Sequence, residues 1–178
     1  MPTFRIAPFA AALATAAALF TPGTAAAAGN CAWANANPND ATLPQVKHAT
    51  LCLINHERRK RGIRKLRDNS RLDLASRRHA NDMSRRKYFD HGDFVGRIKS
   101  ARYLNGARGY TLGENIAWGS FDYATPANIV DGWMHSPGHR ANILNSTFRE
   151  IGLGIARGGP VGGVGRAGTY VTDFGTIF

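Results

Sequence analysis

Four side chains in the sequence are of types that bind divalent metal ions or transfer protons, and glycines or turn residues lie near them. They are His91, Glu114, His139 and Glu150. Imidazole nitrogen and carboxylate oxygen suit zinc and similar divalent cations as ligands. The four residues are separated by 23, 25 and 11 positions, so they do not form the local chelate that one helical turn provides. A shared metal site therefore depends on the fold bringing them together.

Other groupings of reactive side chains are weaker. Ser136 follows His135 but lacks the strand, turn and helix that surround a nucleophilic serine, so we interpret it as a turn residue. His79 falls on an apolar helical stripe with Leu72 and Met83, which favours a hydrogen-bonded core histidine over a ligand. Basic residues alternate too rarely with aromatic ones for a platform that binds single strands. We expect no nucleic-acid partner.

Helical periodicity dominates the first part of the chain and indicates which elements position these residues. Apolar residues recur from Leu43 and predict a helix over 43–61, ended by Gly62. Residues 68–70 offer N-cap oxygens for a second helix that runs to about Lys87. Later helices are predicted around 95–104, over about nine residues after Thr125 and Pro126, and as one turn over 140–144.

The C-terminal third changes to a period of two. Ile151, Leu153 and Ile155 alternate with glycines, and a second alternating segment over 170–174 follows a glycine-rich bend. These segments predict an antiparallel hairpin, whereas the glycine-punctuated residues 92–112 predict a connection with one short helix. Helices followed by strands in a short chain indicate an α+β fold with an antiparallel sheet.

The first 28 residues have the pattern of an export signal. An early arginine, Arg5, precedes an apolar alanine-rich run, and small residues precede Gly29. The run is shorter than the ~20 apolar residues of a membrane span; a buried N-terminal helix is the alternative. We expect cleavage near Gly29, no later membrane span, and a secreted monomer with an N-terminal arm over 29–42 and one domain over 43–178.

Two cysteines occur, Cys31 and Cys52. An even number of cysteines in an exported chain indicates a disulfide, which would tie the N-terminal arm to the first helix and would be the only bond that holds this irregular arm. Two buried free thiols are the alternative interpretation.

Positive charge is concentrated in the first half of the expected mature chain. Residues 29–100 contain 16 Lys and Arg against 7 Asp and Glu, whereas residues 101–178 contain 6 against 5. An exported protein with such a surface is attracted to anionic cell-wall polymers or lipids, which we expect as partners. A solvated face that maintains solubility explains the same charge.

Several longer segments resemble the CAP superfamily, which comprises cysteine-rich secretory, antigen 5 and pathogenesis-related proteins. They are GENIAWG, WMHSPGHRANILN and FREIGLGIA, supported by LINHERRKRG, RRHANDMSRRKYFDH and YVTDFG. The resemblance covers about residues 43–178. It implies a three-layer α-β-α sandwich with a central antiparallel sheet, and a cleft where two histidines and two acidic residues hold zinc or another divalent cation in some members.

Three residues match the ligands of that cleft by motif: His91, Glu114 and His139. The fourth position departs from the family, because Ser136 stands where animal and plant members carry a glutamate. Glu150 is a candidate for the missing carboxylate by residue type alone.

Three functional hypotheses follow from the resemblance and the candidate residues. The first is a secreted, non-catalytic binding module that acts at the cell envelope or outside the cell. The second is a metal-dependent, peptidase-like hydrolase, in which zinc on His91 and His139 lowers the pKa of a bound water and Glu114 is the general base. The third is a purely structural cluster, because buried carboxylates and imidazoles satisfy one another inside a fold.

Overall fold

The computed structural model describes residues 31–178, so the expected export signal lies outside the described residues. The elements follow one another as α1 (Leu43–Arg59), β1 (Arg67–Asp68), α2 (Ser70–Arg86), α3 (Phe94–Ser100), β2 (Tyr110–Ser120), the 3-10 helix η1 (Phe121–Ala124), α4 (Pro126–His135), α5 (Pro137–Leu144), β3 (Glu150–Arg157) and β4 (Ala167–Ile177). No helix within residues 31–178 has the length and apolar character needed to cross a bilayer.

The sheet has the strand order β1-β3-β4-β2. β4 pairs in antiparallel fashion with both β2 and β3, as the hairpin prediction and the family resemblance implied. The short β1 runs parallel to β3, which makes the complete sheet mixed. In this order β2 is an edge strand.

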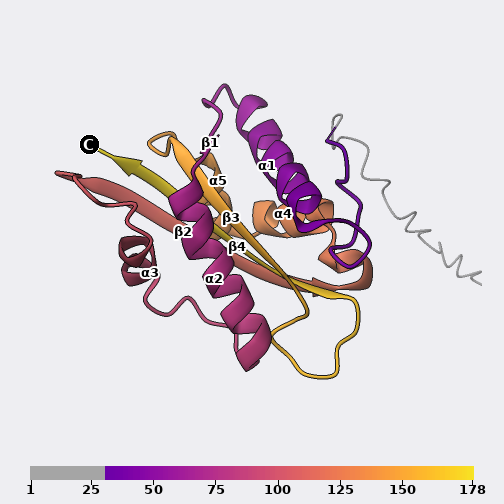
Figure 1. The fold of residues 1–178 in the computed structure, drawn as a ribbon. Coiled ribbons are helices and arrows are strands. Elements are labelled where there is room, and N and C mark those ends of the chain that lie inside the picture. Colours follow the sequence, from indigo (N-terminus) through magenta and orange to yellow (C-terminus); the bar gives the residue numbers. More distant parts are fainter. Residues whose placement is uncertain (1–30) are drawn as a thin grey trace, which may run out of the picture.

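Helices cover both faces of the sheet and give an α-β-α sandwich (Figure 1). α2 lies directly against β3, where a Cβ atom added to Gly152 or Gly154 would lie 2.0 or 2.2 Å from the backbone of α2. Leu153, between the two glycines, joins the core on the opposite face with Ile54 of α1 and Trp133 of α4. The glycines in IGLGIA therefore serve close helix packing, while the alternating apolar residues fill the other layer.

The helix starts follow from local capping. Thr42 and Gln45 form a capping box at α1, and the side chain of Asn69 accepts backbone hydrogen bonds at the start of α2. Thr125 caps α4, whose first residue is Pro126 as predicted. These ends are fixed by residues adjacent in sequence, which is why they are predictable.

The sequence interpretation missed β2. The glycine-punctuated pattern predicts a connection over 110–112 and no strand through GENIAWG, whereas β2 runs from Tyr110 to Ser120. Gly113, Glu114, Asn115 and Ile116 are consecutively buried, so the alternation of polar and apolar residues that identifies a half-buried strand is absent. The buried polar pair belongs to the candidate site.

The disulfide between Cys31 and Cys52 is present, and the described residues contain no free cysteine. The expectation that this bond alone holds the arm was wrong. Asn37 is buried and donates to the backbone carbonyls of Phe121 and Arg166, at 2.7 and 3.0 Å. Arg157 donates to the carbonyl of Pro38 at 2.9 Å. The described part of the arm is therefore integrated into the fold by its own hydrogen bonds.

Candidate functional site

The site is built on two neighbouring residues of β2. Glu114 pairs in register with Asp173 of β4, and its side chain is only 1% exposed. Asn115 donates to the backbone carbonyl of His139 at 3.0 Å and accepts from Asn142 at 2.9 Å. Asn142 also donates to the carbonyl of Glu114 at 3.1 Å. These bonds fix α5, and with it His139, against β2.

His91 reaches Glu114 from the connection between α2 and α3. Its Nδ1 lies 2.8 Å from Oε1 of Glu114. An ionised carboxylate only accepts hydrogen bonds, so Nδ1 donates and Nε2 of the neutral ring keeps its lone pair. The His91 side chain is half exposed, which leaves Nε2 accessible to a ligand.

Arg97 of α3 completes this cluster and was not anticipated from the sequence. Its Nη2 lies 2.5 Å from Oε2 of Glu114, and its Nη1 donates to the backbone carbonyl of His91 at 2.7 Å. The guanidinium thus joins the connection that carries His91 to the edge strand. Both oxygens of Glu114 are consequently engaged, one by His91 and one by Arg97.

His139 lies on α5, close to this cluster. Burial lowers the pKa of His139 below its usual range, and His91 lowers it further when the His91 ring is protonated. The two imidazoles are therefore close enough for their charges to interact. His91, Glu114 and His139 come from three separate elements, and the fold brings all three to the edge of β2.

The fourth candidate, Glu150, makes its contacts elsewhere. The hydroxyl of Tyr103 donates to Oε2 of Glu150 at 2.8 Å, and Arg67 approaches its other oxygen at 3.6 Å. Within residues 31–178, no group of three or more His, Cys, Asp and Glu side chains is arranged to hold a metal ion. The four candidates thus do not form one ligand set, and neither do His91, Glu114 and His139 as a group of three. Glu150 is held apart from them by Tyr103. Cation binding itself stays a prediction.

A second carboxyl group lies beneath Glu114. Asp173 is fully buried, and Oδ2 accepts a hydrogen bond from the hydroxyl of Ser76 at 2.7 Å. Burial and the neighbouring charge of Glu114 raise the pKa of Asp173 well above its usual range, which favours the protonated form of this carboxyl group.

Sequence reasoning missed Arg97, Asn115, Asn142 and Asp173 as parts of the site. Three of them stand inside the family-like segments GENIAWG, WMHSPGHRANILN and YVTDFG, so the motifs did carry a signal. Arg97 lies in none of those segments and becomes visible only in three dimensions.

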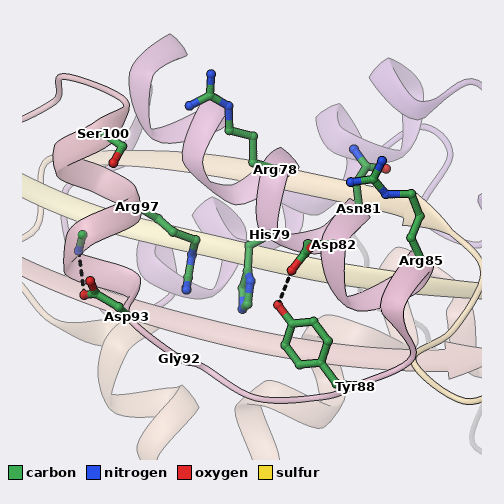
Figure 2. A pocket seen from close by; sticks show the side chains of 11 residues that line it. Arg78, His79, Asn81, Asp82, Arg85, Tyr88, Gly92, Asp93, Arg97 and Ser100 are labelled. Carbon is green, nitrogen blue, oxygen red and sulfur yellow. Dashed lines mark hydrogen bonds between the residues drawn. The ribbon is translucent and has the colours of Figure 1, made fainter.

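His79 is a buried core residue, as its place on the apolar stripe of α2 predicted. Its Nε2 lies 2.9 Å from the backbone carbonyl of Asp90 and donates to it. Burial lowers the pKa of His79, and the charge of Arg97 lowers it further. His79 also borders an open groove between α2 and α3, into which Arg97 projects from the opposite side (Figure 2).

The structure has the α-β-α sandwich that the resemblance implied, and His91, Glu114 and His139 lie at the edge of its sheet. The family model of the cysteine-rich secretory proteins, CAP, matches residues 51–173. The chain belongs to this family.

Two curated relatives come from Bacillus subtilis (strain 168). The uncharacterized protein YkwD is 39% identical over 114 residues, which are 61% of this chain and 42% of YkwD. The uncharacterized membrane protein YlbC is 32% identical over 108 residues, 60% of this chain and 30% of YlbC. The aligned part is therefore less than half of either relative.

Solved structures agree on the fold. An extracellular protein containing an SCP domain from Bacillus anthracis has a TM-score of 0.56 at 24% identity, over 75% of this chain and 43% of its own. An outer surface protein from Borrelia burgdorferi has a TM-score of 0.58 at 18% identity, over 72% of this chain and 90% of its own. Both relatives are extracellular or surface proteins.

Proposed function

We propose that this CAP protein is a secreted, non-catalytic binding module that acts at the cell envelope or outside the cell. The observation that carries the proposal is the orientation of His91 by Glu114 beside His139. A carboxylate that accepts from Nδ1 is the usual outer partner of a histidine whose Nε2 binds a metal ion. The cluster therefore supports an open cation site, completed by water or by the bound ligand.

The residues fit such a site only in part. His91 and His139 are suitable nitrogen ligands for zinc. Glu114 does not fit as a direct ligand, because its two oxygens already accept from His91 and Arg97. The guanidinium also places a positive charge where a cation bound to this carboxylate would be, and like charges at such a distance repel. We expect a two-histidine site that binds its cation weakly.

A metal-dependent hydrolase is the second candidate, and the same geometry disfavours it. The cation would supply an activated water, and Glu114 would have to take a proton from that water as general base. A buried carboxylate with both oxygens hydrogen-bonded is poorly placed for this step. The ion pair between Glu114 and Arg97 is better explained by a structural role, in which it holds His91 in position.

Calorimetric titration of zinc, then calcium and magnesium, into chelator-treated protein tests the proposal. Zinc should bind saturably with one-to-one stoichiometry, and His91→Ala should abolish binding. Glu114→Gln should weaken it, because the amide orients His91 less firmly. The control is His48→Ala on α1, which removes an exposed histidine outside the cluster.

Two results would contradict the cation site. One is absence of zinc binding in folded wild-type protein, which would leave a structural cluster; His91→Ala would then lower the melting temperature without any effect of metal. The other is equal loss of binding in His48→Ala. Turnover of a peptide substrate that disappears with the chelator would instead favour the hydrolase.

A further inference from the structure

The groove between α2 and α3 is a separate recess that shares one wall with the histidine cluster. Its volume is about 790 Å³, within the range of about 300–1,000 Å³ that is typical of sites for small organic ligands. Arg97 belongs to both the groove and the cluster, and Gly92 of the groove lining follows His91 directly. The groove and the histidine cluster therefore lie side by side.

The groove lining contains two carboxylates, and both are engaged by the protein. Asp82 accepts a hydrogen bond from the hydroxyl of Tyr88 at 2.6 Å and pairs with Arg86 at 3.4 Å. Asp93 caps α3 and accepts from the backbone amide of Gly96 at 2.8 Å. Their negative charges are partly compensated before any ligand enters.

The arginines of the lining are less fully engaged. Arg78 and Arg85 are exposed on α2. Neither forms an ion pair with a carboxylate among residues 31–178, and Asp82 of the same helix pairs with Arg86 instead. Arg78 and Arg85 are seven positions apart, which places them on one side of the helix roughly 10 Å apart along its axis. Figure 2 shows their side chains leaving α2 at separate places along the helix, while Arg97 reaches toward His79 from α3.

We propose that this groove binds a chain of organic phosphodiesters, with successive phosphates held at Arg78 and Arg85. This deepens the proposed binding function by naming the chemical class of its ligand, and it rests on that function. Guanidinium groups match phosphate oxygens in a two-pronged hydrogen-bonded geometry. Two arginines separated along a groove suit a linear ligand with repeated charges better than a single small anion.

The composition of the groove favours a soluble chain over a bilayer surface. Apart from Tyr88 and two glycines, the residues that line it have polar or charged side chains, and no aliphatic residue is among them. Proteins that dock on bilayers insert apolar side chains between the lipids. A flat array of headgroups also fits a recessed groove poorly, whereas a flexible phosphodiester chain can follow it.

Calorimetric titration with a short glycerol phosphate oligomer, in the presence of chelator, tests the inference. Wild-type protein should bind the oligomer saturably and lose affinity as salt is raised. The double variant Arg78→Gln and Arg85→Gln should weaken binding about tenfold or more, because hydrogen bonds to charged groups are the stronger ones. A neutral glycerol oligomer should not bind.

The matched control is the double variant Arg64→Gln and Arg77→Gln, which removes the same charge from exposed arginines outside the groove lining. It should change affinity by about twofold or less, since isolated surface charges contribute little at physiological salt. Equal weakening in both double variants would overturn the inference in favour of diffuse attraction.

Two further outcomes would also overturn it. One is absence of oligomer binding by folded wild-type protein. The other is binding to phosphatidylglycerol vesicles without binding to the oligomer, which would indicate a lipid surface. Zinc titration separates this inference from the proposed cation site, because Arg78 and Arg85 do not contact His91 or His139 in the structure, and the groove variant should bind zinc as wild type does. Wild-type protein that binds zinc but not the oligomer rejects the groove alone, and wild-type protein that binds the oligomer but not zinc rejects the cation site alone.

Discussion

Arg97 determines the chemical character of the cluster at the scale of single residues. His91 and Glu114 alone would resemble half of a metal site, with a carboxylate free to bind a cation. Arg97 neutralises that carboxylate and ties it to the backbone of His91. The charge of the carboxylate is thereby compensated by the protein itself, which is why we do not expect Glu114 to bind the cation directly.

Arg97→Met should make the cluster depend on metal. Removing one partner of a buried ion pair leaves an uncompensated charge and costs about 3–5 kcal/mol when burial is complete, and less here because Arg97 is 21% exposed. We expect a lower melting temperature without metal, and tighter zinc binding because Oε2 of Glu114 becomes free. Differential scanning fluorimetry with and without zinc measures both effects.

Arg97→Lys is the control, because it keeps the charge but lacks the fork that reaches Glu114 and His91 together. The zinc affinity of Arg97→Lys should be closer to that of wild type than the zinc affinity of Arg97→Met is. Weaker zinc binding in Arg97→Met than in wild type would show that the guanidinium does not compete with the cation.

The pKa of His79 makes stability depend on pH. Burial and Arg97 hold this pKa below the ordinary value of about 6.5. The folded protein then binds fewer protons than the unfolded chain as pH falls below that value, so the free energy of unfolding decreases with falling pH. His79→Gln should reduce this dependence in urea unfolding measured at about pH 7.5 and about pH 5.5. An unchanged pH dependence, equal to that of a His48→Gln control, would contradict this.

Close contact between α2 and β3 decides the architecture at the scale of elements. Gly152 and Gly154 lie two positions apart and face α2, so the backbone of the helix rests directly on the strand. α2 in turn positions His79 and the connection that carries His91. The glycine alternation in β3 therefore positions the site, although no atom of these glycines belongs to it.

Gly154→Ala should destabilise the protein. The new Cβ would lie 2.2 Å from backbone atoms of Ser76, which a side-chain rotation cannot relieve. Overpacking of this kind costs about 1–3 kcal/mol in the free energy of unfolding. Gly162→Ala in the β3–β4 loop meets no atom within 4 Å and is the control. Equal melting temperatures for the two variants would show that α2 can shift away.

Two features hold together segments that are distant in the sequence. One is the buried Arg58, and the other is the described part of the N-terminal arm. Arg58 is fully buried and donates to the backbone carbonyls of Arg64, Ile143, Asn145 and Phe148. It joins α1 to the segment that leads from α5 into β3. The arm is bound in parallel by the disulfide and by the hydrogen bonds of Asn37 and Arg157.

Removing the disulfide should therefore weaken the protein without unfolding it. The bond closes a loop with a sequence separation of 21, for which loop entropy predicts a loss of about 3 kcal/mol. Cys31→Ser with Cys52→Ser should lower the melting temperature and leave the dispersed amide spectrum of a folded protein. Adding Asn37→Ala should lower it again. Loss of the folded spectrum in the double serine variant alone would contradict the role of the hydrogen bonds.

Elements with local signals, and the family to which the chain belongs, could be predicted from the sequence. Apolar periodicity predicted the helix that begins at Leu43, Thr125 with Pro126 predicted the start of α4, and alternation at Ile151 to Ile155 predicted β3. The motifs identified His91, Glu114 and His139 as candidates. Only the tertiary structure decided what those residues contact, because partners distant in sequence leave no periodic signal. Burial of Glu114 and Asn115 concealed β2, Tyr103 holds Glu150 away from the cluster, and Arg97 reaches the cluster because α3 packs beside α2.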